Sequence, residues 1–210
     1  MKHFFRIIIL LLITIPAFSQ QKLSPEDLQR LQKRAEEYVY NFEYYIKQIS
    51  KMENMQDKQW DIIAALNLFE SNANIEVSNL NGNKYKYLIS DYLKNVVAKY
   101  SQWYEVVVID FTVTEIGKLK QKIDVNGDTI YEGTFKYTQL FCAKLKSFNK
   151  TDIENRSFSA CVNSDYSDKT VKKGKVIVRH VTTIEKGESW IMKLSDISVV
   201  ETSELNSPTK

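Results

Sequence analysis

The chain is poor in several residue types, and each shortage excludes a class of protein. Its 210 residues include only 6 glycines and 3 prolines, which excludes collagen-like and Pro/Gly-rich disordered sequences. Two cysteines are too few for a small disulfide scaffold, and two histidines, one of them at position 3, leave little for a metal site. No segment repeats with a period of about 20 to 50 residues, which excludes a solenoid. We therefore expect one globular domain with no metal and no other cofactor.

An excess of charge of one sign is also missing. The formal net charge is +3, from 29 basic and 26 acidic residues, and Lys2 and Arg6 supply two of the positive charges. Without residues 1–19 the chain has 29 − 2 = 27 basic and 26 acidic residues, a net charge of +1. A nearly neutral protein lacks the basic surface of a nucleic-acid-binding protein, so no nucleic-acid partner is predicted.

Residues 1–19 have the layout of a secretory signal peptide. Lys2 and Arg6 precede the apolar run Ile7–Ile15, and small residues stand at positions 17 and 19 before the cleavage point. The run is shorter than the roughly 20 apolar residues that a membrane-spanning helix needs. We expect cleavage after Ser19 and a periplasmic or secreted protein with no stable membrane span; an uncleaved membrane anchor is the alternative. Residues 20–202 are expected to form a single domain and 203–210 a flexible tail.

The apolar spacing predicts a long first helix over about residues 25–51. Ser24 can cap its first turn, and Pro25 suits the first helical position. The apolar residues recur at alternating steps of three and four: Leu28, Leu31, Ala35, Tyr38, Phe42, Tyr45, Ile49 and Met52. This stripe packs either against the helix's own domain or, because it extends over several heptads, against a second chain as a coiled-coil seam.

The rest of the chain predicts two more helices and a set of strands. A helix from Asp57 to about Phe69 has little polar face and is expected to be mostly buried, and a third helix is expected near residues 90–100. A short strand at 73–77 leads to a hairpin turn at Asn81-Gly82. Alternating apolar residues then predict long strands at 103–116, 129–146, 175–185 and 189–201, with a bulge near Ser195-Asp196.

Asn126-Gly127 predicts the turn that leads into the strand at 129–146. Asp124, Asn126 and Asp128 also match part of a calcium-binding loop, but the glycine is misplaced and the distal glutamate is missing. A hairpin turn is therefore the better interpretation of this segment.

Helices followed by long antiparallel strands predict an α+β fold, with the N-terminal helices packed on a curved antiparallel sheet. In its order of elements the sequence resembles the nuclear-transport-factor-2-like superfamily, which includes ketosteroid-isomerase-like and SnoaL-like proteins. Four segments are similar to those of a secreted group that we associate with Bacteroidota: Leu66–Phe69, Ala73–Val77, Asp91–Leu93 and Tyr166–Thr170. The resemblance implies a cone-like fold with a pocket between the sheet and the helices.

The two cysteines fit a hairpin. Their midpoint lies inside the polar stretch Asn149–Asn155, so a loop there places Cys142 directly opposite Cys161. The same register sets Tyr137 against Tyr166 on the apolar face. We predict a Cys142–Cys161 disulfide, which an exported protein can retain, with two separate thiols as the alternative.

Three residues are candidates for chemistry: Asp168, Asp110 and His180. In the predicted register Asp168 lies opposite Phe135 and next to Tyr137, and burial beside aromatic rings can raise the pKa of a carboxyl group into a useful range. A buried acid with ordinary hydrogen bonds, or a core histidine, is the alternative for each. No Asp–Tyr or His–Asp pair matches the enzymatic members of the superfamily position by position. The residues predicted to line the pocket are Tyr131, Phe135, Tyr137, Phe141 and Tyr166.

Two functions remain open. The first is a non-catalytic module of the cell envelope that binds another protein or a second copy of itself, and the uninterrupted stripe of the first helix favours it. The second is a protein that holds a small apolar ligand in the cone, as a carrier or as an isomerase- or dehydratase-like enzyme. The lysines at positions 169, 172, 173 and 175 are interpreted as a solvated strand edge and not as a binding patch.

Overall fold

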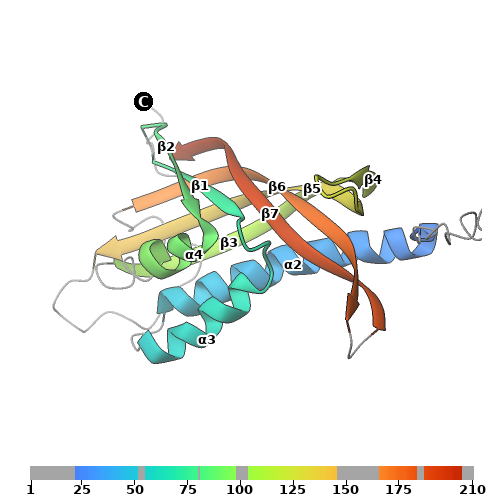
Figure 1. The fold of residues 1–210 in the computed structure, drawn as a ribbon. Helices are drawn as coiled ribbons and strands as arrows, with labels where there is room; N and C mark the ends of the chain where they lie inside the picture. The colour runs from blue at the N-terminus through green and yellow to red at the C-terminus, as the bar shows by residue number, and fades with distance from the viewer. Residues whose placement is uncertain are drawn as a thin grey trace, which may run out of the picture.

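The computed structural model describes residues 22–51, 55–79, 81–97, 104–145, 166–183 and 187–204. Within these ranges the helices lie on one side of a curved sheet (Figure 1). The predicted α+β fold class is confirmed, with the N-terminal helices packed on a curved, mostly antiparallel sheet. The predicted signal peptide at 1–19 lies outside the described residues.

The described helices are α2 (Pro25–Lys51), α3 (Met55–Leu66) and α4 (Ile89–Asp91), and α4 continues as a π-helical turn, η1 (Tyr92–Val97). The strands are β1 (Asn74–Ser78), β2 (Lys84–Leu88), β3 (Tyr104–Ile116), β4 (Lys120–Ile123), β5 (Thr129–Leu145), β6 (Tyr166–Thr183) and β7 (Gly187–Glu204). They form one sheet in the order β2-β1-β7-β6-β5-β3, with β4 paired to β5. Neighbouring strands are antiparallel except where β1 meets β7. Among the described residues, no helix is long and apolar enough to span a bilayer.

Helix α2 has the predicted bounds and the predicted cap. The backbone N–H of Asp27 donates to Ser24 Oγ over 3.1 Å, which satisfies one of the free donors of the first turn. The buried stripe includes Val39 and Ile46, whereas the predicted Tyr38 and Tyr45 are half-buried at its side. A straight helix drifts away from a strict heptad pattern, which explains why the buried positions shift by one residue, from Tyr38 to Val39 and from Tyr45 to Ile46. The stripe packs against β3 and α3 of its own chain.

Helix α3 corrects one prediction. Ile62 and Ala65 are buried, but Trp60 is 75% exposed and Ile63 is 44% exposed, so the helix is not buried on most sides. Figure 1 shows the reason: α3 lies outside the sheet, alongside α2, so only its inner side is covered.

Both predicted hairpin turns are confirmed. Gly82 and Gly127 have φ values of 79° and 86°, a conformation that glycine adopts without steric cost. The N–H of Gly82 donates to the carbonyl of Asn79 over 2.9 Å, and that of Gly127 to the carbonyl of Asp124 over 3.1 Å. These turns join β1 to β2 and β4 to β5.

The predicted bulge in β7 is also confirmed. Leu194 pairs with Val176 and Ile197 pairs with Gly174, so Ser195 and Asp196 together face the single residue between those partners on β6. The extra residue keeps both Leu194 and Ile197 in the core, although three positions separate them. Strand β7 then continues to Glu204, so it includes the first two residues of the predicted tail at 203–210.

Strand β6 is longer than predicted. The sequence suggested a new strand from Lys175, preceded by a solvated lysine-rich edge, but one strand runs from Tyr166 to Thr183. It lies in the middle of the sheet and pairs with β5 on one side and β7 on the other. The interpretation of this segment as an edge is therefore wrong.

Candidate functional site

The face of the sheet that turns toward the helices, here called the inner face, carries alternate residues of β5 and β6. Phe135 and Gly174 are direct cross-strand partners, and a Cβ atom at Gly174 would lie 2.2 Å from Phe135 Cζ. The phenyl ring therefore lies directly over the glycine on this face. Because side chains alternate along a strand, Lys172 shares the inner face with Gly174, and Tyr137 shares it with Phe135.

A buried polar group interrupts the apolar inner face; we call it the inner-face polar cluster. Its members come from two adjacent strands: Tyr137 and Gln139 on β5, and Asp168, Thr170 and Lys172 on β6. Their exposed fractions are 0%, 8%, 6%, 3% and 3%, in that order. Charged and amide side chains are rarely buried to this extent, so a cluster of them on two adjacent strands is unusual.

Strand register places the members side by side. Lys172 is the direct cross-strand partner of Tyr137, and Thr170 is the partner of Gln139. The hydroxyl of Thr170 donates to Asp168 Oδ1 over 3.1 Å. Direct partners have Cβ atoms about 5 Å apart and diagonal ones about 7 Å apart, so long side chains reach one another here.

In the part of the chain that the structure describes, two of these groups lack the hydrogen-bond partners that burial normally demands, and a third has no carboxylate close enough for an ion pair. The hydroxyl of Tyr137 and the amide oxygen Oε1 of Gln139 make no hydrogen bond within the described ranges. Among the described residues, no carboxylate lies within 4.0 Å of Lys172 Nζ. Each unmade bond of a buried polar group costs roughly 1 to 3 kcal/mol, a large share of a typical stability of about 5 to 15 kcal/mol.

The surroundings alter the proton affinity of two members. Burial lowers the pKa of Lys172 from 10.5 to about 8, although the negative charge of Asp168 acts in the opposite direction. Burial raises the pKa of Tyr137 well above 10.0, and the neighbouring Tyr92 adds to this shift. At neutral pH the cluster therefore offers a neutral phenol beside an amine that loses its proton unusually easily.

Aromatic rings surround the Tyr137 end of the cluster. The Tyr137 ring centroid lies 4.7 Å from that of Phe111 and 6.0 Å from that of Phe135, against which it stacks. Phe111 in turn lies 6.0 Å from Phe42 on α2. The site thus has an aromatic wall that connects the sheet to the first helix.

The five residues predicted to line a pocket do not form one group. Phe135 and Tyr137 are buried in the aromatic wall, and Phe141 is half-buried beside Asp168. Tyr131 lies at the other end of β5, where its ring contacts Trp190 at 5.5 Å and its hydroxyl accepts the N–H of Leu23 over 2.9 Å. The side chain of Tyr166 lies outside what the structure describes, and pocket lining stays a prediction.

The register predicted between the cysteine-bearing strands is wrong. Cys142 pairs with Ser167, six positions beyond the predicted Cys161. The prediction assumed a hairpin loop centred between the cysteines, whereas the observed register places the centre three residues further along the chain. Cys142 is fully buried. Cys161 lies outside the described residues, so a bond between the two cysteines stays a prediction.

The same change of register moves Asp168. Its direct partner on β5 is Phe141 and not Phe135, and the partner of Tyr137 is Lys172 and not Tyr166. Asp168 is nevertheless buried on the inner face, as its prediction as a candidate acid requires.

The other two candidates lie elsewhere. Asp110 is exposed on the outer face, because its neighbours Ile109 and Phe111 both turn inward. His180 lies near the far end of β6, where its ring contacts that of Trp190 at 5.0 Å. It is twelve residues from Asp168, roughly 40 Å along an extended strand, so these two groups cannot act on one small molecule.

Lys172 and Gln139 are the site residues that sequence reasoning missed. Lys172 was grouped with three other lysines as a solvated edge, and Lys169, Lys173 and Lys175 are indeed exposed. Strand alternation was the available signal, since Lys172 has the same parity as Asp168 and as the apolar residues at 176 and 178.

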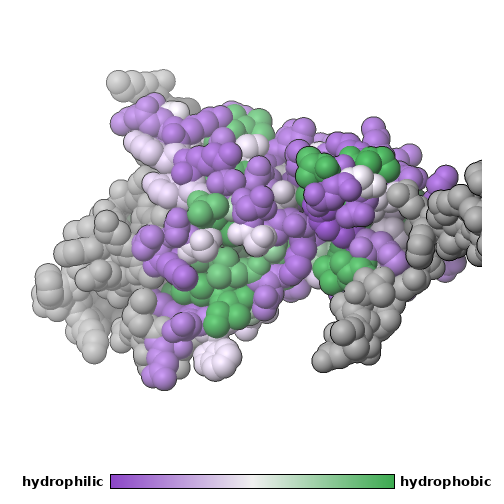
Figure 2. Space-filling view, viewed as in Figure 1, coloured by the Kyte–Doolittle hydropathy of each residue, from purple (hydrophilic) through white to green (hydrophobic). Residues whose placement is uncertain are grey.

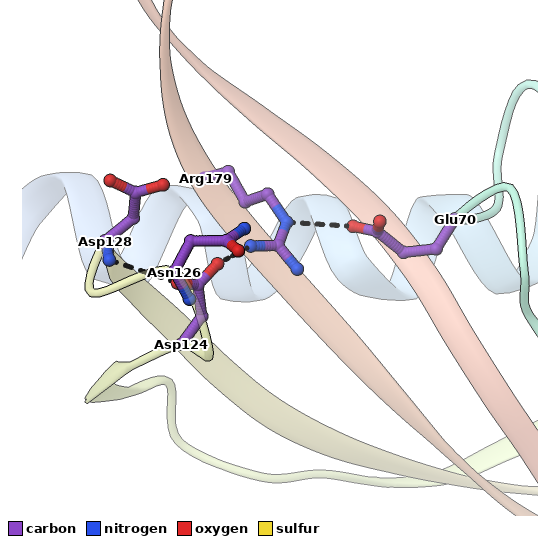
Figure 3. Close-up of polar contacts among 5 residues, drawn as sticks. All are labelled: Glu70, Asp124, Asn126, Asp128 and Arg179. Carbon is purple, nitrogen blue, oxygen red and sulfur yellow. Dashed lines mark hydrogen bonds and ion pairs between the residues drawn. The ribbon is translucent and has the colours of Figure 1, made fainter.

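A second polar group, drawn in Figure 3, has a structural explanation. Arg179 NH1 contacts Asp124 Oδ2 at 2.5 Å, and its Nε donates to Glu70 Oε1 over 3.4 Å. Asp124 Oδ1 accepts the backbone N–H groups of Asn126 and Asp128 over 2.8 and 3.0 Å. Burial of Asp124 opposes its ionisation, but these backbone bonds and Arg179 outweigh it and keep the pKa of Asp124 below its usual value.

This arrangement fixes the turn between β4 and β5 against β6 and the segment that follows α3. Both oxygens of Asp124 are occupied by protein donors, which confirms the hairpin interpretation over the calcium loop. Within the described ranges, no group of three or more His, Cys, Asp or Glu side chains could hold a metal ion.

Comparison with known proteins gives a likeness in fold only. No protein-family model and no curated protein matches the sequence. Among solved structures, one described as "Putative Scytalone Dehydratase" from Novosphingobium aromaticivorans DSM 12444 is similar, with a TM-score of 0.43 and 10% sequence identity. The match covers 87% of this chain and 93% of that chain. A likeness this distant carries no argument about activity.

Proposed function

We propose that the protein binds a small molecule against the inner-face polar cluster. One observation carries this proposal: Tyr137 and Gln139 hold buried polar atoms with no hydrogen-bond partner in the part of the chain that the structure describes, and the buried amine of Lys172 lies on the adjacent strand. Natural proteins satisfy nearly all buried polar groups, and the exceptions are frequently functional. A ligand that hydrogen-bonds to these groups recovers the free energy that is lost when they are buried without partners.

The three groups define the chemistry of the ligand's polar end. Lys172 and the Tyr137 hydroxyl can donate, so the ligand offers an oxygen acceptor, and Gln139 Oε1 requires a donor such as a hydroxyl. The aromatic wall of Phe111 and Phe135 suits an apolar remainder. We therefore propose a mostly apolar molecule with an oxygen-bearing polar end.

A protein-binding module of the cell envelope is the second candidate. The stripe on α2 that first suggested it is used inside the domain, so any such surface lies elsewhere. Figure 2 shows hydrophobic residues gathered over α3 and the adjoining part of α2. On α3 itself, Trp60 and Ile63 are exposed. In either case we propose that the protein is exported, with cleavage after Ser19 and a Cys142–Cys161 disulfide, because the leader and the cysteine count fit that compartment.

Native mass spectrometry of protein gently extracted from its own cell envelope tests the proposal. We expect a small-molecule adduct on the wild-type protein and on Lys173→Met, whose side chain is exposed on the opposite face of the same strand. Lys172→Met and Gln139→Leu are expected to lose it while remaining folded by circular dichroism. A wild-type protein without any adduct, or an adduct retained equally by Lys172→Met, would contradict the proposal. The same spectra give the N-terminal residue and show whether the two cysteines are oxidised.

A further inference from the structure

Within the described chain, Lys172 is buried without a close carboxylate, unlike the other lysines of its strand, and a simple hydrogen-bond donor needs neither property. Lys169, Lys173 and Lys175 on the same strand are exposed, whereas Lys172 is 97% buried, beside the Tyr137 phenol and without a carboxylate within 4.0 Å among the described residues. A buried ammonium group without a carboxylate close enough for an ion pair is poorly stabilised, so its neutral amine form is favoured. A neutral amine is a nucleophile.

We propose that Lys172 binds its ligand covalently, as an imine with an aldehyde or ketone. This inference rests on the proposed function, since it uses the same site and names the class of the ligand's polar end. The amine of Lys172 and the two polar atoms without a hydrogen-bond partner match the intermediate of that reaction. Lys172 supplies the nitrogen, the Tyr137 hydroxyl can donate to the former carbonyl oxygen, and Gln139 Oε1 can accept the hydrogen of the resulting hydroxyl.

The reaction needs no co-reactant. The lone pair of the neutral Lys172 Nζ forms a bond to the carbonyl carbon, the π electron pair of C=O moves to oxygen, and a proton passes from nitrogen to that oxygen to give a carbinolamine. The C–O bond then breaks, the hydroxyl leaves with a proton as water, and the nitrogen lone pair forms the C=N bond. Carbonyl compound and amine thus give imine and one water, and a proton taken up by nitrogen gives the iminium form. The surrounding rings of Phe111 and Phe135 limit the access of the water that would reverse the last step.

The charges near the amine make its reactivity depend on pH. Among the described residues, the titratable groups nearest to it are Asp168 on its own strand and its cross-strand partner Tyr137 on β5, and Tyr92 on η1 in turn acts on Tyr137. Tyr137 stays protonated well above pH 10, so the amine itself governs the profile between pH 6 and 9. At pH 7.5 an amine with a pKa of about 8 is roughly one-quarter neutral, against about a thousandth for an ordinary lysine.

Reductive trapping tests the inference on the chain from residue 20 onward. The protein is incubated with 4-hydroxybenzaldehyde or, as a smaller probe, acetaldehyde at pH 7.5, then treated with sodium borohydride and mapped by peptide mass spectrometry. We expect modification of Lys172 at a probe concentration at least about tenfold below that needed for Lys173 or Lys175. Labelling of Lys172 is expected to rise between pH 6 and 8. Its preference over Lys173 and Lys175 is expected to vanish when the protein is unfolded in urea before labelling.

Variants separate this inference from the proposed function. Lys172→Met and Lys172→Arg are expected to lose the low-concentration adduct, and Lys173→Met is expected to keep it. Labelling of exposed lysines with Lys172 unmodified by both probes would overturn the inference. If native spectra still show a non-covalent adduct that depends on Lys172, small-molecule binding at the cluster stands and only the imine fails. Absence of both kinds of adduct from the wild-type protein contradicts both proposals.

Discussion

At the scale of single residues, Lys172 is held in the interior at a measurable cost. Its pKa is lowered to about 8 in the folded protein, against 10.5 in the unfolded chain, so folding opposes the charged form. Between these two pH values the unfolded state binds more protons than the folded state, and stability therefore rises as the pH rises from about 8 to about 10.5. The shift corresponds to roughly 3 kcal/mol that is lost at neutral pH.

Replacing this lysine with an apolar residue of similar length should therefore stabilise the protein. We expect Lys172→Met to raise the free energy of unfolding by roughly 2 to 3 kcal/mol at pH 7, with the gain shrinking toward zero near pH 10.5. Urea denaturation at a series of pH values measures this difference. The difference between wild type and variant largely cancels the separate effect of Tyr137, whose raised pKa destabilises the fold only above pH 10.

Lys173→Met is the matched control, because its side chain is exposed on the other face of β6. It should change the free energy of unfolding by less than about 0.5 kcal/mol. A Lys172→Met variant that is less stable than wild type at pH 7 would show that the lysine is not a buried, unpaired charge.

Gly174 is a second residue that can be tested singly, because its contact with the Phe135 ring leaves no room for a side chain. A Cβ atom there would meet three atoms of the Phe135 ring, at 2.2, 2.7 and 2.9 Å, and that ring is buried and cannot move away freely. We expect Gly174→Ala to lower the free energy of unfolding by about 1 to 3 kcal/mol. A thermal or urea melt measures the loss.

A double-mutant cycle identifies the cause. Leucine at position 135 lacks the ring atoms that obstruct the new methyl group, so Gly174→Ala should cost clearly less in a Phe135→Leu background than in the wild type. Equal costs in the two backgrounds would place the strain in the backbone of β6 and not in the ring.

At the scale of elements, the β1–β2 hairpin is held against β7 by hydrogen bonds between side chains and backbone. Among the described residues, β1 pairs with β7 only at Ile75 and Ile197. The bulge turns Asp196 so that its Oδ1 accepts the N–H of Asn74 over 2.8 Å, and Glu76 Oε2 accepts the N–H of Val199 over 3.0 Å. These bonds replace the backbone ladder that is missing at the junction.

We therefore expect Asp196→Ala to lower the free energy of unfolding by about 1 kcal/mol and to speed hydrogen exchange in β1 and β2 more than in β5 and β6. Hydrogen-exchange mass spectrometry measures both effects. Ser198→Ala is the control, because Ser198 makes only an exposed bond of 3.3 Å to the carbonyl of Lys173. A uniform change in exchange over the whole sheet would show that the junction is not the weak point.

The elements also show which features can be predicted from sequence. The cap at Ser24, the turns at Gly82 and Gly127 and the bulge at Ser195-Asp196 each depend on residues within a few positions of one another, and all four are found. The alternation that makes β5 a strand is equally local.

The register between β5 and β6 is not local, because it depends on the twenty residues 146–165 that separate the end of one strand from the start of the next. A symmetric hairpin around the cysteines fitted the pattern of apolar residues but was six positions away from the observed pairing. Both registers place Asp168 on the inner face, so its burial was predicted while its neighbours were not. Lys172 was missed because its burial depends on a central strand running through a segment with the composition of an edge.

At the scale of the whole molecule, α2 joins the parts of the fold. Its inner stripe lies against β3 and α3, and Phe42 contacts both Phe69 and Phe111, with ring centroids 4.8 and 6.0 Å away. Its outer face carries Tyr40 and Tyr44, which are 42% and 54% exposed. Because α2 has one buried and one exposed face, glutamate can be introduced on either face and the two effects compared.

We expect Leu31→Glu combined with Phe42→Glu to unfold the protein, because each buries a carboxylate without a partner at a cost of several kcal/mol. Tyr40→Glu combined with Tyr44→Glu should leave circular dichroism and urea stability within about 1 kcal/mol of wild type. Light scattering after gel filtration then gives the mass of the folded variant Tyr40→Glu with Tyr44→Glu. If the wild-type chain is a dimer and this variant a monomer, the outer face of α2 is its interface. If the variant Leu31→Glu with Phe42→Glu stays folded and only its mass falls, the stripe on α2 is instead a seam between two chains. The packing of α2 on its own sheet described above is then wrong.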